Sequence, residues 1–289
     1  MKVNHIYLIL FSVLLLNSCG DSTNQAKEQS KDASGTASIV PPKIRDTALL
    51  YDFGKSFEVL VKAPKTKFKG TILVLQGWNF PNTSWCDNSE LCEKALEEGY
   101  FLVMPAMEKS IYHFKTYDAT RKDWADNPTR DWLMKSVCAD LEKKYGLFSP
   151  KHNNYILGLS TGGRGALLIA QENPEIFVAG ASLSGDYDQS AFPDDNLYRG
   201  YFGKDPEKWD AKENPIATID NWKVPMYIGH GEMDSVVSIQ HAKHLQQMTD
   251  GFVPHLRFEY SFVPTAGHDY LYWSAEVGNI LRFFERYER

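Results

Sequence analysis

The sequence has few cysteines, no excess of basic residues and no internal repeat. Its 289 residues carry 31 Lys and Arg against 37 Asp and Glu, a formal net charge of −6, and no basic stripe is visible. Nucleic acid is therefore not an expected partner. The four cysteines do not have the spacing of a zinc site, and no cysteine pair lies near a histidine pair. We accordingly expect no metal and no cofactor.

The first residues are typical of an export signal. Met1-Lys2 is a short positive segment, and residues 6–16 form an apolar run too short to span a bilayer as a mature helix. The sequence Leu16-Asn17-Ser18-Cys19-Gly20 resembles the lipobox of bacterial lipoproteins. The resemblance implies a lipoprotein signal over 1–18, acylation of Cys19 and a periplasmic or cell-surface protein held at the membrane by that lipid. A plain secretory signal or an uncleaved anchor is the alternative.

The rest of the chain divides into a tether and one domain. Residues 19–42 are expected to be flexible, because 21–38 contain almost no large apolar side chain with which to offset the entropy of ordering. Residues 43–289 have the length of a single large α/β domain with a sizeable core.

Three cysteines remain once Cys19 is assigned to the anchor. Outside the cytoplasm, Cys86 and Cys92 could close a small loop as a disulfide and leave Cys138 buried and free. Three buried thiols are an equally good interpretation of the same spacing.

Buried strands alternate with helical segments along the domain. The expected strands cover residues 55–64, 70–76, 100–104, 155–157, 177–183, 224–229 and 256–262, and the expected helices include 89–98, 131–145 and 273–287. This alternation predicts an α/β fold with a mainly parallel sheet and helices on both faces. Segment 108–129 is aromatic and charged with no clean period, so we expect a long loop over the strand ends.

A G-x-S-x-G motif, Gly158-Leu-Ser160-Thr-Gly162, separates a buried strand from a helical pattern. Its glycines allow a strained turn that would lift the Ser160 hydroxyl above the sheet, toward the positive end of the following helix. Strand, turn and helix in this order favour a nucleophilic serine. The alternative is a glycine-rich turn whose serine only caps the helix.

A nucleophilic serine needs a base, and the base needs a carboxylate to orient it. In this architecture the order along the chain is Ser, then Asp or Glu, then His. Asp234 follows the strand that ends at residue 229, and His268 follows the strand that ends near residue 263. We therefore predict Ser160 as nucleophile, Asp234 as acid and His268 as base.

Other titratable residues compete for the last two roles. Glu232 could serve as the acid, and Asp186, which follows the preceding strand, could approach the same imidazole. His230 stands at a strand end and is expected to pack or to stabilise a turn. His241 and His244 fall on a helical stretch and are expected at the surface.

The reaction also needs donors for the oxyanion. The N–H of Thr161, directly after the serine, is the first expected donor. The loop after residue 76 should supply the second, with the N–H of Trp78 the best candidate and that of Asn79 the next.

The chain resembles the α/β-hydrolases, and within them the esterase group that contains esterase D, feruloyl and acetylxylan esterases and mycolyltransferases. The resemblance covers most of residues 55–287. It rests on segments 158–167, 173–177, 181–185, 201–203, 230–234 and 267–273. It implies the same roles for Ser160, Asp234 and His268. The chain departs from the group at Gln76-Gly77, where His-Gly is usual, and in segment 108–129.

The predicted function is therefore a serine esterase that cleaves carboxylic esters through an acyl-enzyme, with acyl groups on carbohydrates as a candidate substrate. Five aromatic residues could line a sugar or phenolic pocket or could pack in the core: Trp78, Trp124, Tyr187, Tyr270 and Trp273. A prolyl-oligopeptidase-type peptidase is one alternative, although such enzymes usually carry a large additional domain. An inactive hydrolase used for binding is another. The sequence predicts no oligomeric state.

Overall fold

The computed structural model describes residues 40–192, 194–252 and 257–289. The predicted signal 1–18, Cys19 and nearly all of the predicted tether 19–42 lie outside the described residues. The strands are β1 (Thr47–Asp52), β2 (Ser56–Lys62), β3 (Gly70–Leu75), β4 (Tyr100–Pro105), β5 (Asn154–Leu159), β6 (Ala179–Leu183), β7 (Met226–Gly231) and β8 (Phe258–Val263). The α-helices are α1 (Ser84–Asn88), α2 (Leu91–Glu98), α3 (Arg130–Trp132), α4 (Ala139–Tyr145), α5 (Thr161–Glu172), α6 (Asn196–Phe202), α7 (Gln240–Phe252) and α8 (Tyr270–Glu285).

Irregular helical segments complete the chain. A π-helical stretch, Leu133–Cys138, joins α3 to α4 and makes one continuous helix of the predicted segment 131–145. Short 3-10 turns cover Pro206–Lys208, Ala211–Glu213 and Pro215–Asn221. Within the described part of the chain, no helix is long and apolar enough to cross a membrane.

The eight strands form one sheet in the order β1-β2-β4-β3-β5-β6-β7-β8. Strands β4, β3, β5, β6, β7 and β8 pair in parallel, while β1 with β2 and β2 with β4 pair antiparallel. This confirms the predicted α/β fold with a mainly parallel sheet. The edge strand β1 was not predicted, because only alternate side chains are partly buried and no continuous apolar run marks it.

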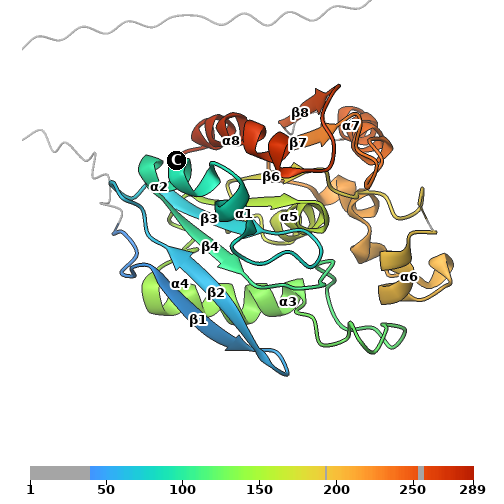
Figure 1. The fold of residues 1–289 in the computed structure, drawn as a ribbon, viewed down its shortest axis with the longest axis horizontal. Helices are drawn as coiled ribbons and strands as arrows, with labels where there is room; N and C mark the ends of the chain where they lie inside the picture. Colours follow the sequence, from blue (N-terminus) through green and yellow to red (C-terminus); the bar gives the residue numbers. More distant parts are fainter. Residues whose placement is uncertain (1–39, 193, 253–256) are drawn as a thin grey trace, which may run out of the picture. The chain divides into compact units, whose positions relative to one another are not determined.

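Helices cover both faces of the sheet, as the sequence predicts (Figure 1). In β3, Leu73 and Leu75 join the core beneath the α3–α4 helix, α5 and α7, whereas Ile72 and Val74 join the core beneath α1, α2 and α8. Because side chains alternate between the faces of a strand, a continuous apolar run is what a doubly covered strand requires.

Of the two interpretations of the cysteines, the structure has the one with a disulfide. Cys86 at α1 bonds to Cys92 at α2, and Cys138 is a free, buried cysteine in the core. The disulfide closes the turn between the two short helices that follow strand β3.

Segment 106–129 contains no strand or helix, in agreement with the predicted long loop. Its Ile111 and Trp124 pack with Tyr198, Tyr201 and Phe202 of α6, forming an aromatic cluster separate from the two cores of the sheet. The loop and α6 therefore support each other.

A buried carboxylate, Glu213, ties these irregular segments to the sheet. Its side chain is fully buried and accepts hydrogen bonds from the Phe114 N–H at 2.7 Å and the Tyr117 hydroxyl at 2.6 Å. It also pairs with Arg130 Nη1 at 2.6 Å and Arg164 Nη2 at 3.4 Å. Burial by itself would raise the pKa of Glu213, but the two guanidinium groups outweigh it and hold that pKa below its ordinary value.

Replacing Glu213 by Ala should lower the free energy of unfolding by about 3–5 kcal/mol, because it removes a buried carboxylate partner from two buried guanidinium groups, those of Arg130 and Arg164. Urea denaturation followed by fluorescence measures this, with the exposed Glu207→Ala as the matched control. Since the pKa of Glu213 is lowered by folding, the difference should be full above the unfolded pKa of about 4.3 and shrink as the pH falls below it. Equal stabilities of the two variants at neutral pH would contradict the assigned role.

Candidate active site

Ser160 occupies the sharp turn that the motif predicts. It lies between β5 and α5 with φ 54° and ψ −127°, a conformation that non-glycine residues rarely adopt. Its N–H donates to the Leu183 carbonyl at 2.8 Å, and its side chain makes no capping hydrogen bond to α5. The hydroxyl is therefore held at the positive end of the helix without being used as a cap.

The glycines around Ser160 permit close backbone approach. A Cβ atom at Gly158 would lie 2.0 Å from the Gly162 carbonyl oxygen, and one at Gly162 would lie 2.5 Å from that of Gln76. A Cβ atom at Gly77 would lie 3.1 Å from Ser160 Cβ. The loop after β3 is thus packed directly against the serine, where a second oxyanion donor is needed.

Asp234 and His268 meet across the ends of β7 and β8. His268 Nδ1 lies 2.7 Å from Asp234 Oδ2, and the Asp234 side chain is fully buried. The other oxygen, Oδ1, accepts the N–H groups of Val236 at 2.9 Å and Val237 at 2.8 Å. The two backbone N–H groups hold the carboxylate in the orientation in which it contacts the imidazole.

The charge on Asp234 follows from its partners. Burial alone would raise its pKa, but hydrogen bonds from His230, His268 and the Val237 N–H outweigh that effect and lower it. An ionised carboxylate on Nδ1 of His268 places the proton on that nitrogen and leaves Nε2 as an acceptor. The Trp273 indole packs against the imidazole nearly at right angles, with 5.0 Å between the ring centroids.

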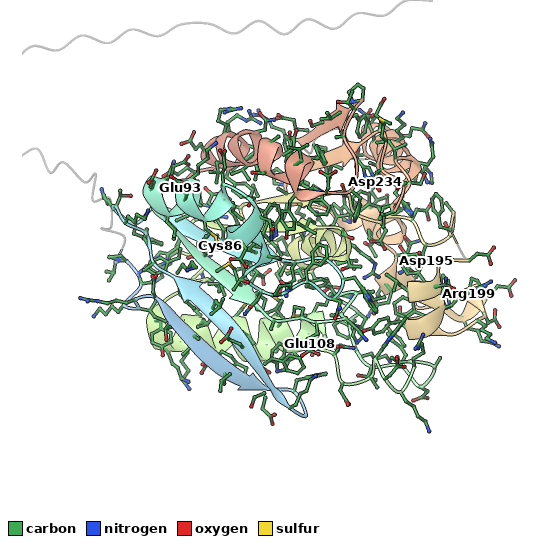
Figure 2. The ribbon with its side chains drawn as sticks, in the orientation of Figure 1. Cys86, Glu93, Glu108, Asp195, Arg199 and Asp234 are labelled. Carbon is green, nitrogen blue, oxygen red and sulfur yellow. A yellow bond between two sulfur atoms is a disulfide. The ribbon has the colours of Figure 1, made fainter. Side chains whose placement is uncertain are left out.

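A cavity of about 730 Å³ opens above Ser160. Asp195, at the start of α6, and Asp234 both line it and are labelled in Figure 2, where they come from different segments of the chain. The full lining is Trp78, Ser160, Thr161, Asp186, Ala191, Phe192, Asp194, Asp195, Leu197, Asp234, Ser235, Val236, Val237, Ser238 and His241. Serine, acid and both predicted oxyanion residues therefore face one space.

Two groups of this site have no hydrogen-bond partner within it. Among the described residues, no hydrogen bond joins Ser160 Oγ to His268, and His268 is not among the residues that line the cavity, although its partner Asp234 is. The N–H of Trp78 also has no hydrogen-bond partner in the described part of the chain, whereas that of Asn79 donates to the Glu108 carbonyl at 2.8 Å. Trp78, and not Asn79, therefore keeps a donor available.

The competing acids lie elsewhere. Glu232 is exposed and pairs with Lys243 at 3.5 Å. Asp186 contacts the Tyr198 hydroxyl and lies 3.8 Å from Arg164 Nε, and burial raises its pKa to about 6. Neither makes a hydrogen bond to His268 among the described residues.

The expectation that His241 lies at the surface is wrong. Only 5 % of the residue is exposed, because the first turn of α7 packs this side chain beneath the loop that follows β6. Its Nδ1 accepts the N–H groups of Tyr187 and Asp188, each at 3.2 Å. His244 is partly exposed, as expected, and pairs with Asp188 at 2.8 Å. His230 is fully buried at its strand end, with Nε2 2.9 Å from the Val237 carbonyl.

Of the five aromatic residues considered for a substrate pocket, Trp78 alone lines the cavity. It meets Trp124 edge-on at 4.8 Å between ring centroids. The others pack against the cores or the aromatic cluster: Trp124, Tyr187, Tyr270 and Trp273. Phe192 does line the cavity and was not singled out from the sequence, because nothing in its loop marks it.

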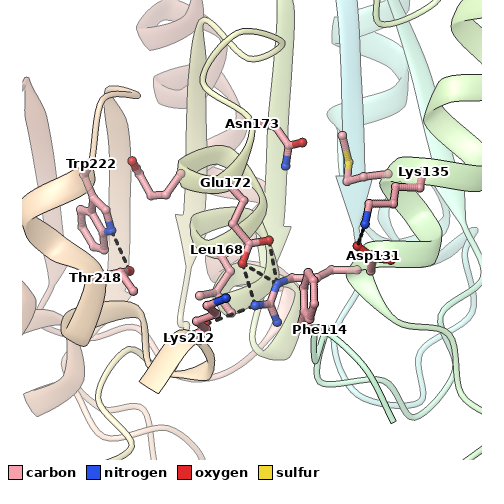
Figure 3. A pocket seen from close by; sticks show the side chains of 12 residues that line it. Phe114, Asp131, Lys135, Leu168, Glu172, Asn173, Lys212, Thr218 and Trp222 are labelled. Carbon is pink, nitrogen blue, oxygen red and sulfur yellow. Dashed lines mark hydrogen bonds and ion pairs between the residues drawn. The ribbon is translucent and has the colours of Figure 1, made fainter. Parts of the chain in front are cut away.

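A second cavity, of about 410 Å³, shares no lining residue with the first. Figure 3 shows Phe114, Glu172 and Lys212 among its lining residues, which also include Arg130. The carboxylates of Glu172 and Glu213 neutralise the guanidinium of Arg130, which lines this second cavity. Its lining contains no serine or cysteine beside a histidine.

The sequence profile of the prolyl oligopeptidase family matches residues 95–287, well over half of the chain. The chain belongs to the prolyl oligopeptidase family. The match to this family includes Ser160, Asp234 and His268 and leaves out the loop that carries Trp78. Comparison with curated proteins gave no significant match.

Solved structures show that this family member has the α/β-hydrolase fold. An S-formylglutathione hydrolase from Agrobacterium tumefaciens is 15 % identical with a TM-score of 0.69, covering 86 % of this chain and 100 % of its own. FphF, a fluorophosphonate-binding serine hydrolase of Staphylococcus aureus, is 18 % identical with a TM-score of 0.69, covering 85 % and 99 %. A ferulic acid esterase is 18 % identical with a TM-score of 0.62, covering 86 % and 99 %.

Replacing Gly158 by Ala should displace the turn that carries Ser160, because the new methyl group would overlap the Gly162 carbonyl oxygen. We expect a loss of about 1–3 kcal/mol in the free energy of unfolding, as in other overpacked sites. Thermal and urea denaturation measure it. Gly278→Ala in α8, whose Cβ atom would meet only the mobile end of Arg282, is the control and should be neutral or stabilising. A Gly158→Ala protein as stable as the control would contradict the close approach.

Proposed function

We propose that this protein is a serine esterase that cleaves carboxylic esters through an acyl-enzyme formed on Ser160. The observation that carries the proposal is the strained turn of Ser160, which opens on the same cavity as the carboxylate that holds His268. Residues with such strained backbone conformations, which lower the stability of the fold, cluster at functional sites.

In the proposed reaction, Ser160 Oγ attacks the ester carbonyl carbon while His268 Nε2 takes the hydroxyl proton. The N–H groups of Thr161 and Trp78 stabilise the oxyanion, a contribution of about 3 kcal/mol for each donor in comparable sites. Collapse of the intermediate breaks the ester C–O bond, and His268 returns the proton to the leaving alkoxide. Water then repeats the sequence on the acyl-enzyme and releases the acid, with Asp234 orienting the imidazole throughout.

The charge of the cavity supports a neutral or cationic substrate. Asp186, Asp194 and Asp195 line it together with Asp234, and the lining includes no Lys or Arg. Arg164 and Arg199, which lie outside the lining, pair with Asp186 and Asp194 and offset part of this charge. Like charges facing each other in a partly desolvated site cost free energy, so a substrate with its own carboxylate is disfavoured. Acyl groups on neutral carbohydrates fit this cavity and are the substrate class we propose.

Family membership supports a second candidate, a serine peptidase. The same reacting groups would serve an amide, and the acidic lining would suit a peptide amino group. A catalytically inactive binding protein remains the third hypothesis, which a covalent label at Ser160 tests directly.

We also propose that the domain formed by residues 43–289 is carried on a tether, residues 19–42, attached to the cell envelope by lipid on Cys19. The motif before Cys19 and the composition of the tether support this placement.

Ser160→Ala should lower kcat for 4-nitrophenyl acetate by at least about 10³-fold and abolish labelling by a fluorophosphonate. The exposed Ser56→Ala is the control and should behave as wild type. An active, labelled Ser160→Ala protein would sink the mechanism, and an unlabelled wild type would favour the binding hypothesis. Comparing ester and peptide substrates on the same proteins separates esterase from peptidase.

The enzyme should prefer a neutral ester, 4-nitrophenyl pentanoate, over 4-nitrophenyl hemisuccinate by at least about tenfold in kcat/KM at low salt, because the lining is acidic. The preference should narrow with added salt. It should also narrow as the pH falls below about 6, where Asp186, with its pKa raised to about 6, becomes neutral. Asp186→Asn should reduce the preference and the remote Asp118→Asn should not. A preference for the anionic ester would contradict the proposal.

A further inference from the structure

His241 stands in the wall of the cavity that contains Ser160 and is more than nine-tenths buried. Its place at the start of α7 brings it beneath the loop that follows β6. Burial lowers the pKa of this imidazole to about 4, so the ring is neutral at ordinary pH. A neutral imidazole has one donor nitrogen and one acceptor nitrogen.

The backbone decides which nitrogen is the donor. Nδ1 faces two N–H groups, those of Tyr187 and Asp188, at 3.2 Å each. An atom that accepts from N–H groups cannot itself carry a proton, so the proton is on Nε2. Two backbone N–H groups therefore fix the tautomer of His241, and they leave its donor, the Nε2–H, free for another partner.

No acceptor in the described part of the chain takes the Nε2–H. The carboxylate of Asp188, whose N–H binds Nδ1, is engaged elsewhere, with Oδ2 on His244 at 2.8 Å and Oδ1 on the Ser190 N–H at 3.0 Å. Phe192 stacks on the imidazole at 4.0 Å between ring centroids and covers one of its faces. Nε2 is not among the fully shielded unpaired side-chain atoms of the described residues, and His241 lines the cavity, so we take the Nε2 edge of the ring as the part that borders it.

Asp186 lies in the same lining as His241, but neither of its oxygens is a free acceptor on the cavity surface. Asp186 Oδ1 is buried and has no hydrogen-bond partner, while its Oδ2 contacts the Tyr198 hydroxyl. Unpaired polar atoms of this kind cost free energy unless a ligand or water satisfies them. The Nε2–H of His241 is therefore a polar group of this wall that a ligand can reach, and a hydroxyl oxygen is an acceptor that suits it.

We propose that His241 is a specificity-determining residue whose Nε2–H donates a hydrogen bond to a hydroxyl oxygen of a polyol, such as a sugar ring, bound in the cavity. This inference rests on the proposed function, since it takes the polyol to be part of the ester cleaved at Ser160. It adds a named residue and a hydrogen-bond direction to the substrate class.

Two substitutions separate recognition from support of the backbone. In His241→Asn, the side-chain oxygen can replace Nδ1 as the acceptor for the two N–H groups, but the Nε2 donor is lost. In His241→Gln, the side-chain nitrogen can replace the Nε2 donor, but the Nδ1 acceptor is lost. His244→Asn, one turn further along α7 and half-exposed, is the matched control.

The experiment compares kcat/KM for an acetylated methyl xyloside with kcat/KM for cyclohexyl acetate, a ring of similar size without hydroxyls. The ratio of the two should fall about fivefold to tenfold in His241→Asn, the loss expected for one hydrogen bond. It should fall less in His241→Gln, which should instead unfold at a lower urea concentration. The ratio should not change in His244→Asn. An unchanged ratio in a folded His241→Asn protein, or a larger fall in His241→Gln, would overturn the inference.

Calorimetric binding of methyl xyloside to the same proteins keeps this test independent of catalysis. If the wild type cleaves no ester and takes no fluorophosphonate label, the proposed function fails. Weaker sugar binding by His241→Asn than by wild type would still support the role of His241. Equal binding by both, or no binding by wild type, would overturn it.

Discussion

The burial of the Glu213 carboxylate is the constraint on which the irregular half of this molecule depends. A buried charge is tolerated only when it is paired and hydrogen-bonded. Glu213 meets this condition with groups from the loop 106–129, from α3 and from α5. Segments without regular secondary structure of their own are thereby fixed against the sheet.

The network of buried charges around Glu213 extends to the wall of the cavity that contains Ser160. Arg164 lies one turn after Ser160 on α5, and its guanidinium connects Glu213 to Asp186 in the cavity wall. Its Nη1 also donates to the Ile111 carbonyl of the long loop at 2.5 Å. The helix that begins at the serine is therefore also the attachment point for the walls of the cavity. Serine position and cavity shape are set by one buried network.

The parts that could be predicted from the sequence are those with a local signal. A doubly covered strand requires a continuous apolar run, and a tight turn requires glycine, so most strands and the turn at Ser160 could be read directly. The contact between Asp234 and His268 could be anticipated because each follows its own strand. Edge strand β1, Glu213 and His241 carried no such signal. The roles of Glu213 and His241 come from partners between 49 and 99 residues away in the chain, as for Glu213 with Arg164 and Phe114, and only the tertiary fold brings these together.

This difference also explains why the sequence predicts a type of reaction more readily than a substrate. Acyl transfer needs a serine, a base and an acid at strand ends, and each has a fixed place in the topology. The cavity above them is built instead from the loop after β6, from α6 and from the start of α7. The selectivity that we propose for it depends on the acidic lining and on which nitrogen of His241 carries the proton. Two backbone N–H groups decide that tautomer, and backbone groups are present at every position whatever the sequence. A substrate preference set in this way is a property of the folded chain that no sequence motif records.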